Sequence, residues 1–227
     1  MNLTVSDVSA LLKVPEKQVY RWIDEGELSC HWFHNQPRFN RTLLLEWATA
    51  HRMPIALDQF LDDEEVDVVV PGVAANLTAG GIFRNIGGND RATVLRNVVA
   101  VLPIPTMEKE TLAEVLLAQE AAGSTGIGNG IAIPHARQPI ILGGVPSFIS
   151  LCFLDHPVDF AAVDGILVHT LFLMVGTTVR GHLQSLAQLS LALRHPQFRN
   201  AVLHREANDE IVAAAATVEA TFHSVVR

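Results

Sequence analysis

Apolar residues recur with helical spacing at three places in the first 53 residues, and two short strand-like runs separate the second place from the third. The first helix starts at Thr4, because Thr4 and Asp7 have the spacing of a capping box. Proline suits the first position of a helix and glycine suits its end, so Pro15 and Gly26 delimit the second helix. Residues 1–53 are therefore predicted to form a small unit of helix, turn, helix, hairpin and helix.

From residue 73 onward, apolar runs of strand length alternate with longer apolar stripes of helical spacing. Helices are predicted over residues 92–102 and 107–121, and a further one starts after Thr177 or Thr178. Strands are predicted over four runs, which are residues 77–84, 131–133, 148–154 and 166–175. This alternation predicts an α/β domain with a mixed sheet and helices on both faces of the sheet.

Residues 54–72 separate these two parts and have the composition of a linker. Prolines, a Pro-Gly pair and the acidic run of residues 62–65 interrupt them, although residues 66–70 could add a strand. The acidic run is predicted to be a solvated spacer. The chain therefore divides into three parts, which are residues 1–53, residues 54–72 and residues 73–227.

The formal net charge of −8 at pH 7 argues against a protein that simply coats nucleic acid. No apolar run is long enough to cross a bilayer, and residues 1–7 lack the features of a secretory signal, so no membrane insertion is predicted. Cys30 and Cys152 fall in different parts, which indicates a reducing, cytoplasmic environment. No pair of histidines or cysteines has the spacing of zinc ligands, so no metal or other cofactor is predicted.

Residues 123–137 hold the densest group of candidate functional residues. Four glycines occur within eight residues, a short apolar strand follows, and Pro134 ends that strand directly before His135. Such a loop exposes backbone N–H groups that can hold an anion. A P-loop needs lysine after its last glycine, but Asn129 follows Gly128, and a dinucleotide fingerprint opens a helix rather than a strand. The remaining interpretation is a histidine that itself takes a phosphoryl group beside a phosphate-sized loop.

The stretch from Ser124 to His135 resembles the phosphohistidine signature of the enzyme IIA components of the bacterial phosphotransferase system. The similarity is to the fructose/mannitol and nitrogen-regulatory branch, and it extends more loosely over about residues 73–222. The resemblance implies that His135 accepts a phosphoryl group from a small histidine phosphocarrier protein. The residues predicted to bind that group are Ser124, Thr125, Gly126, Gly128, Asn129, Gly130 and Arg137.

A second histidine, His182, falls in the first turn of the helix predicted after Thr178. A helix N-terminus disfavours the imidazolium and attracts anions, so a neutral His182 could donate to a phosphoryl group on His135. The resemblance implies the same, because the family has a second functional histidine at this place. Taken alone, the pattern would equally fit a solvated histidine at a helix start.

The chain departs from the family at Gln119, where many members have an arginine that assists the phosphoryl group. A neutral amide cannot offset developing charge as a guanidinium does. Either Arg137 or Arg180 substitutes for the missing arginine, or transfer is slow in this protein.

Residues 1–53 resemble the winged helix-turn-helix domains of excisionases and MerR-like regulators, most clearly at Tyr20-Arg21-Trp22-Ile23 with Gly26. In that family the second helix enters the major groove and the wing touches the DNA backbone. The resemblance therefore implies DNA contacts by Lys17, Gln18, Arg21 and Arg38.

The formal net charge of this unit is zero, since it holds six Lys or Arg and six Asp or Glu residues. A phosphate-binding surface normally has excess positive charge, so a protein-binding or dimerising module is the alternative. A homodimer that pairs two weak half-sites would reconcile the pattern with the charge.

Together these patterns predict a cytoplasmic bacterial regulator that couples a phosphohistidine domain to a DNA-binding domain and to downstream regulatory proteins. One alternative is a sugar-transport component that passes its phosphoryl group to a separate permease. The other is a non-catalytic protein whose second domain is only a docking surface, which Gln119 favours.

Overall fold

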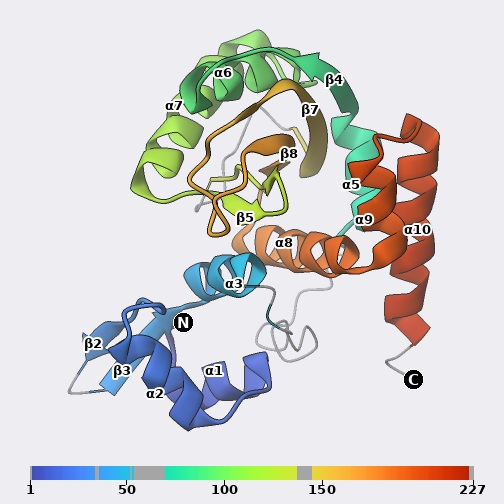
Figure 1. Cartoon of the computed structure of the whole chain (residues 1–227). Coiled ribbons are helices and arrows are strands. Elements are labelled where there is room, and N and C mark those ends of the chain that lie inside the picture. The colour runs from blue at the N-terminus through green and yellow to red at the C-terminus, as the bar shows by residue number, and fades with distance from the viewer. Residues whose placement is uncertain (1, 34–35, 52, 54–69, 137–144, 225–227) are drawn as a thin grey trace. The chain divides into compact units, whose positions relative to one another are not determined.

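The computed structural model of the chain describes residues 2–33, 36–51, 53, 70–136 and 145–224 (Figure 1). The chain divides into two compact units, Met1–Asp67 and Val68–Arg227. The acidic run, nearly all of the predicted linker and Arg137 lie outside the described residues.

The first unit contains the predicted helices and hairpin. Its elements are β1 (Asn2–Leu3), α1 (Val5–Leu12), α2 (Glu16–Asp24), β2 (His31–Phe33), β3 (Gln36–Asn40) and α3 (Arg41–Ala50). The capping box is confirmed, because the Asp7 N–H donates to the Thr4 hydroxyl and the Thr4 N–H donates to the Asp7 carboxylate. Pro15 is the N-cap of α2 rather than its first helical residue. The short strand β1 was not predicted, and it pairs with β3 to complete a three-stranded sheet in the order β1-β3-β2.

The second unit is a mixed α/β domain, as predicted. Its sheet has the order β4-β7-β8-β6-β5, in which β7 and β8 are antiparallel while β4 with β7 and β6 with β8 are parallel. The strands are β4 (Ile82–Ile86), β5 (Gly126–Gly128), β6 (Ile131–Ala132), β7 (Phe148–Val158) and β8 (Val168–Val175). The helices are α5 (Val73–Gly80), α6 (Arg91–Val101), α7 (Thr106–Ala122), α8 (Val179–Arg194), α9 (Pro196–Leu203) and α10 (Asn208–Ser224).

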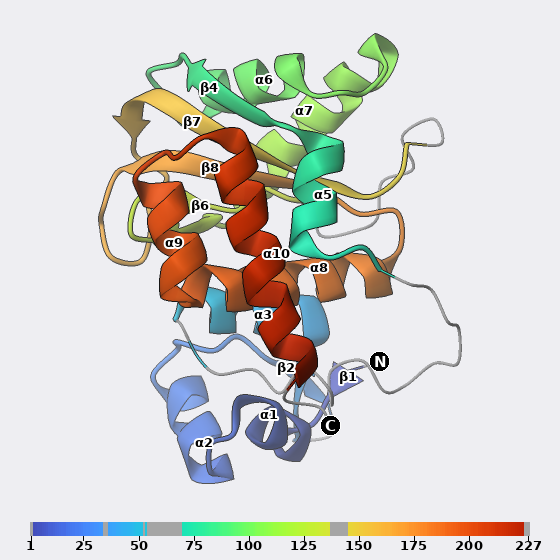
Figure 2. The same cartoon turned by 90° about the vertical axis from the view of Figure 1, so that its right-hand side faces the viewer.

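Helices cover both faces of this sheet. Figures 1 and 2 show α6 and α7 on one side of it and α5, α9 and α10 on the other. On the first side, Cys152 and Leu171 join the apolar residues of α6 and α7 in one buried cluster. On the other side, Phe172 of β8 packs against Phe198 of α9, with ring centroids 6.2 Å apart. Most of the central strands β7 and β8 is buried on both faces, which explains their nearly continuous apolar sequence.

The prediction of a strand over residues 77–84 is wrong for residues 77–80, which complete helix α5. Val73 and Leu77 are spaced four residues apart and are both fully buried, so this run has a helical apolar face. Gly80 lets the helix lie against β7, because a Cβ atom there would be 2.2 Å from the carbonyl oxygen of Ile149. The strand begins only at Ile82.

Candidate functional site

His135 lies just after β6, where it forms a parallel bridge with Met174 of β8. It is buried, with 3% of its surface exposed. Its Nδ1 atom lies 2.7 Å from the carbonyl oxygen of Ile133. Because a carbonyl oxygen only accepts hydrogen bonds, Nδ1 must carry the proton, and the lone pair of the neutral ring is on Nε2. Nε2 is therefore the nitrogen that can act as a nucleophile.

His182 lies in the first turn of α8, whose N-cap is Thr178. Its ring faces that of His135, with centroids 5.0 Å apart and planes tilted by 36°. It is only 4% exposed, and burial, followed by the charge of His135, lowers the pKa of His182 to about 3. His182 is therefore neutral near pH 7. Among the described residues its buried Nε2 atom has no hydrogen-bond partner, so one ring position remains available to a ligand.

Gly176, which precedes α8, makes room for this histidine. A Cβ atom on Gly176 would lie 2.8 Å from the Cβ atom of His182. Contacts under 3.0 Å between such atoms essentially do not occur, so a side chain here would displace His182. Gly176 was not predicted as a site residue, and its position two residues before the helix cap was the available signal.

The glycine-rich run folds into a hairpin. β5 and β6 are antiparallel, and the turn between them has Asn129 at φ 55° and Gly130 at φ 72°. Two adjacent positive φ angles are typical of the tight hairpin turn that Asn-Gly favours. A side chain on Gly130 would also force His169 to move, since a Cβ atom there would be 2.3 Å from Nε2 of His169. The run therefore contributes a shaped turn as well as the strand that leads to His135.

This turn lies at the far end of the hairpin from His135. The carbonyl oxygen of Gly130 accepts from Thr170 N–H, whereas His135 pairs with Met174, four residues farther along β8. At about 3.3 Å per residue, the separation along the strand is about 13 Å. The structure thus does not bring Gly128, Asn129 or Gly130 to His135. It does bring Thr125 near, because Ile133 N–H donates to the Thr125 carbonyl oxygen at 2.9 Å.

The expectation of free backbone N–H groups is wrong at three positions of the run. The N–H of Thr125 donates to the carboxylate of Glu120, at 3.2 Å to Oε2. The N–H of Gly126 donates to the Ser124 hydroxyl at 3.0 Å, and the N–H of Asn129 donates to Asp164 at 2.7 Å. These groups serve the fold of the hairpin in this structure, so their role in phosphoryl binding stays a prediction.

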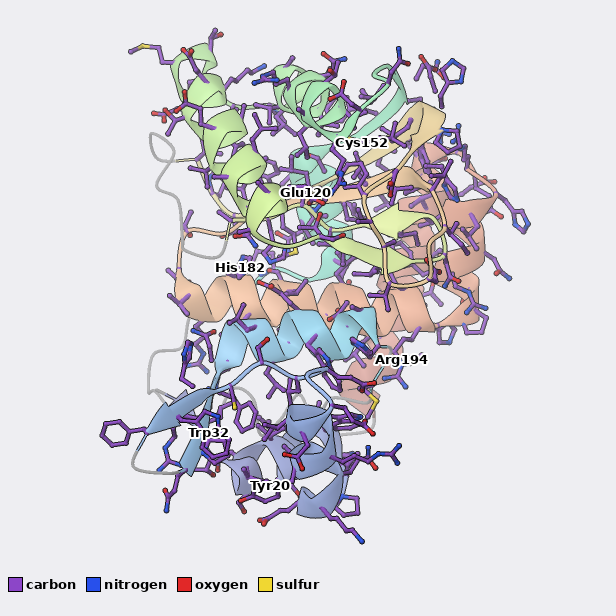
Figure 3. All side chains as sticks on the ribbon, turned by 60° about the vertical axis from the view of Figure 1, so that its left-hand side comes forward. Tyr20, Trp32, Glu120, Cys152, His182 and Arg194 are labelled. Atoms are coloured by element: carbon purple, nitrogen blue, oxygen red, sulfur yellow. The ribbon has the colours of Figure 1, made fainter. Side chains whose placement is uncertain are left out.

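Glu120 is a residue of this site that the sequence analysis missed (Figure 3). It lies near the C-terminal end of α7, is 5% exposed, and has one oxygen 3.8 Å from the Arg91 guanidinium. Burial raises the pKa of Glu120, while the hydrogen bonds from Thr125 and the charges of Arg91 and His135 oppose that rise. A carboxylate in the last turn faces the negative end of the helix dipole. That unfavourable position, beside Gln119, was the signal that could have identified it.

In the first unit, two of the four predicted DNA-contacting residues, Arg21 and Arg38, have side-chain partners of their own, and Gln18 is half-buried on α2. Lys17 and Arg21 are exposed on α2, and Arg21 Nε donates to Glu25 at 2.8 Å in an exposed ion pair. Arg38 of β3 donates to Gln36 at 2.8 Å. Exposed pairs of this kind contribute only about 0–1 kcal/mol to stability, so an anion could replace Glu25 or Gln36 as the partner of the arginine. Their role in binding DNA stays a prediction.

Three exposed aromatic residues, Tyr20, Trp32 and Phe33, lie in the same unit and were not predicted as site residues, and Figure 3 labels the first two. Tyr20 is exposed on α2, beside Arg21, and Trp32 is 62% exposed on the edge strand β2. Exposed aromatic side chains are enriched at binding surfaces because they combine a large apolar area with a polar group.

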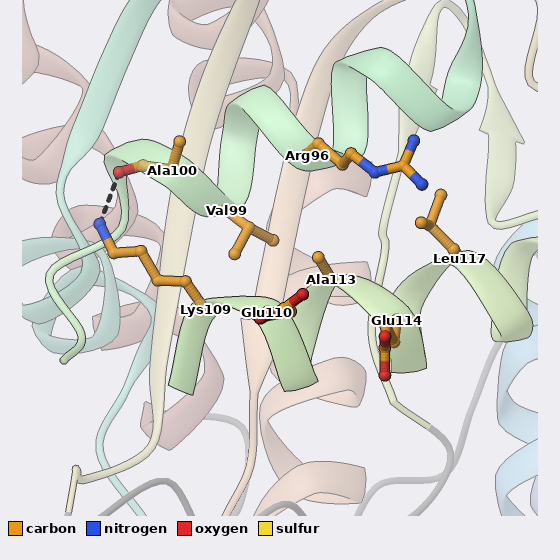
Figure 4. Close-up of a pocket in the computed structure, with 8 residues that line it drawn as sticks. All are labelled: Arg96, Val99, Ala100, Lys109, Glu110, Ala113, Glu114 and Leu117. Carbon is orange, nitrogen blue, oxygen red and sulfur yellow. Dashed lines mark hydrogen bonds between the residues drawn. The ribbon is translucent and has the colours of Figure 1, made fainter. Parts of the chain in front are cut away.

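A groove between α6 and α7 has a volume of about 360 Å³ (Figure 4). Lys109 donates to the carbonyl oxygen of Ala100 at one end of it. The residues that line it are Arg96, Val99, Ala100, Lys109, Glu110, Ala113, Glu114 and Leu117. The lining contains two cations and two carboxylates, and neither His135 nor His182 belongs to it. The histidine pair is therefore the better candidate site.

Within the described ranges, no group of three or more His, Cys, Asp or Glu side chains could hold a metal ion. Within the same ranges, no helix is long and apolar enough to span a membrane.

Comparison with known proteins agrees with this architecture. The nitrogen regulatory protein of Pseudomonas aeruginosa is 36% identical over 155 residues, which cover 66% of this chain and 92% of that protein. The fructose-specific EIIABC component of the phosphotransferase system of Bacillus subtilis is 31% identical over 140 residues, which are 60% of this chain but 22% of that longer protein. The crystal structure of the nitrogen regulatory protein IIA-Ntr from Neisseria meningitidis has a TM-score of 0.53 at 24% identity and covers 63% of this chain and 98% of that one, which shows the shared fold.

Two family models match the chain, one in each unit. Residues 3–52 match a helix-turn-helix domain. Residues 75–216 match the family described as phosphoenolpyruvate-dependent sugar phosphotransferase system, EIIA 2. The chain therefore belongs to the EIIA 2 family of the phosphoenolpyruvate-dependent sugar phosphotransferase system, with a helix-turn-helix domain at its N-terminal end.

Proposed function

We propose that this protein accepts a phosphoryl group on Nε2 of His135 from a histidine phosphocarrier protein and acts as a regulator. The observation that carries the proposal is the pair of buried imidazoles, because one offers a nucleophilic nitrogen and the other an unpaired ring nitrogen. Membership of the phosphotransferase family supports the same chemistry.

In the proposed step, the Nε2 lone pair of His135 attacks phosphorus in line with the phosphorus–nitrogen bond of the donor. The new bond to Nε2 forms as the donor bond breaks, and the electrons of that bond return to the donor imidazole. The proton on Nδ1 stays on His135, held by the Ile133 carbonyl oxygen. Neutral His182, with its proton on Nε2, donates to a phosphoryl oxygen, and a preorganised donor in a buried site stabilises developing charge effectively.

Within the glycine-rich run, the residues contribute in two ways. Arg137, two residues after His135 in the sequence, stays a candidate for contacts to the phosphoryl oxygens. Ser124 also stays a candidate, although in this structure its hydroxyl donates to the Phe160 carbonyl oxygen and accepts from Gly126 N–H. Gly128, Asn129 and Gly130 instead shape the distant turn. Thr125 and Gly126 hold the hairpin through their internal hydrogen bonds.

The regulatory part of the proposal rests on the helix-turn-helix domain and on the nitrogen regulatory relatives. A phosphoryl group adds about −1.5 to −2 charges to the buried histidine pair at pH 7. That change alters which partner can dock, and we propose that it is coupled to DNA binding through Lys17, Gln18, Arg21 and Arg38, in a homodimer.

A second candidate function is a transport component that passes the phosphoryl group to a separate permease, as the fructose-specific relative suggests. Transfer from the phosphorylated protein to an added sugar-specific component, with sugar phosphate formed, would favour this candidate over the regulator.

The test is the intact mass of the full chain after incubation with a phosphocarrier system. One added phosphoryl group that is labile in acid and stable in base is expected, since that is the behaviour of phosphohistidine. His204→Ala is the matched control, because His204 is an exposed histidine at the end of α9. Labelling of His204→Ala but not of His135→Ala supports the proposal, and full labelling of His135→Ala contradicts it.

A further inference from the structure

A continuous path of hydrogen bonds joins the buried carboxylate of Glu120 to the ring of His135. Oε2 of Glu120 accepts from the Thr125 hydroxyl at 2.5 Å and from the Thr125 N–H at 3.2 Å. The Thr125 carbonyl oxygen accepts from Ile133 N–H at 2.9 Å, and the Ile133 carbonyl oxygen accepts from Nδ1 of His135 at 2.7 Å. The path therefore runs from α7 through Thr125, which precedes β5, and Ile133, which follows β6, to the ring nitrogen opposite the nucleophile.

The position of Glu120 in the fold disfavours an ionised carboxylate. Glu120 is almost fully buried at the negative end of a helix, and its cationic neighbour Arg91 is 3.8 Å away with 38% of its side chain exposed. Oε2 of the Glu120 carboxylate accepts two hydrogen bonds from one residue, Thr125. A carboxylate has acceptor sites for both donors on one oxygen, and hydrogen bonds to an ionised acceptor are the stronger kind.

The hairpin needs such an anchor because its own strands are short. β5 has three residues, β6 has two, and their register shifts between Gly126 and Gly128. β8 holds this segment from one side, through its pairing with β6 and through Met174 N–H, which donates to the Pro134 carbonyl oxygen at 3.0 Å. Thr125 holds it from the other side, so a fixed Thr125 helps to keep the Ile133 carbonyl oxygen where it meets Nδ1 of His135. If that carbonyl moved, Nδ1 would lose its acceptor and the proton could reside on either ring nitrogen.

We propose that Glu120 is a positioning residue for His135, acting through Thr125 and Ile133 to keep the proton on Nδ1 and the lone pair on Nε2. The part of this proposal that concerns phosphoryl transfer rests on the proposed function. The part that concerns the proton on the ring does not, because the unphosphorylated protein already has the hydrogen bonds.

The experiment uses the full chain and three variants, with two measurements on each. Thr125→Val removes the hydroxyl with little change in shape, Thr125→Ser keeps the hydroxyl, and Glu120→Gln removes the charge. The first measurement is the ring ¹⁵N chemical shifts of His135, assigned against His135→Ala, which report the nitrogen that holds the proton. The second is the initial rate of phosphohistidine formation with a phosphocarrier system.

In the parent protein and in Thr125→Ser, the proton is expected on Nδ1. In Thr125→Val and Glu120→Gln, the shifts should move toward a mixture of the two neutral forms, and labelling should slow by about tenfold, as expected for the loss of one charge-assisted hydrogen bond. A purely structural role would lower stability without redistributing the proton, so the shifts separate the two explanations.

The proposal is overturned if Thr125→Val and Glu120→Gln are folded and His135 keeps its parental ring shifts. If Glu120→Gln does not fold, the comparison of Thr125→Val with Thr125→Ser decides the question alone. If the parent takes no phosphoryl group at all, the proposed function fails, while the ring shifts still test the positioning role separately.

Discussion

The ring of His182 lies 5.0 Å from the ring of His135, centroid to centroid, although 46 residues of chain separate the two. His182 lies in the first turn after a helix N-cap, His135 follows the end of a strand, and both rings are buried. A phosphoryl group on His135 would therefore be within reach of a donor on His182.

The first prediction concerns the separate roles of the two histidines. His135→Ala should abolish phosphoryl uptake, because it removes the nucleophile. His182→Ala should retain uptake but slow it by about 10²-fold, the usual effect of losing one preorganised donor to developing charge. His182→Gln keeps an N–H donor and should be faster than His182→Ala. Quenched-flow labelling measures all three rates, and equal rates for His182→Ala and the parent would contradict the donor role.

The second prediction concerns stability in acid. Burial lowers the pKa of His182 to about 3 from 6.5, so the folded protein resists a proton that the unfolded chain accepts. The contribution of His182 to the free energy of unfolding is complete above pH 6.5 and is lost as the pH falls from 6.5 toward 3. The loss amounts to about 2 kcal/mol by about pH 5.

Glu120 changes stability with pH in the opposite direction. Burial raises the pKa of Glu120 above 4.5, so the contribution of Glu120 to the free energy of unfolding is largest in acid and is lost as the pH rises through the raised value.

Because the effects of the two residues overlap in the parent, the test for His182 is the difference in free energy of unfolding between the parent and His182→Gln, measured in urea at several pH values. That difference should move in favour of His182→Gln as the pH falls. Parallel pH profiles would show that His182 is accessible to protons in the folded state.

A third prediction concerns the missing arginine at residue 119. If positive charge at this position limits transfer, Gln119→Arg should speed phosphorylation about fivefold, which corresponds to about 1 kcal/mol of barrier. Gln119→Met, of similar length and without charge, is the matched control and should not be faster than the parent. An unchanged or slower rate for Gln119→Arg would indicate that another arginine, such as Arg180, already supplies the charge.

A fourth prediction separates lack of space from backbone strain at glycine. Gly130 and Gly165 have similar angles, φ 72° and φ 69°, but a Cβ atom on Gly130 would meet His169 at 2.3 Å, whereas one on Gly165 would meet nothing within 4 Å. Gly165→Ala should therefore lower the free energy of unfolding by about 1 kcal/mol, and Gly130→Ala by about 2–4 kcal/mol. Chemical denaturation of the two variants measures both values, and equal losses would show that His169 moves aside without cost.

The fifth prediction concerns the helix-turn-helix domain. Selection of binding sites from random DNA by the full chain, phosphorylated and not, should enrich a sequence with two half-sites. Arg21→Ala should then relax the sequence preference, while Arg38→Ala should weaken binding to all sequences alike. Glu25→Gln releases Arg21 from its ion pair and should strengthen binding. If no sequence is enriched in either state, the domain is a protein-interaction module instead.

The sequence by itself determined the features that depend on neighbouring residues. The capping box at Thr4, an N-cap at Thr177 or Thr178 and the end of a strand before Pro134 are local, because each is set by bonds within a few residues. The structure has the N-cap at Thr178 and ends β6 at Ala132. Apolar periodicity likewise indicated the mixed α/β domain and the helix-turn-helix unit. For the same reason His135 and His182 could each be placed at the end of an element.

Only the tertiary structure decided which of these residues meet. It brought Glu120 to Thr125 and left the Asn129 turn at the far end of the hairpin, and it selected the protonated nitrogen of His135 through the Ile133 carbonyl oxygen. It also placed residues 77–80 at the end of helix α5, where Gly80 lets the helix lie against the backbone of β7. Burial and hydrogen bonding between distant segments depend on strand order and packing, which no local pattern of residue types specifies.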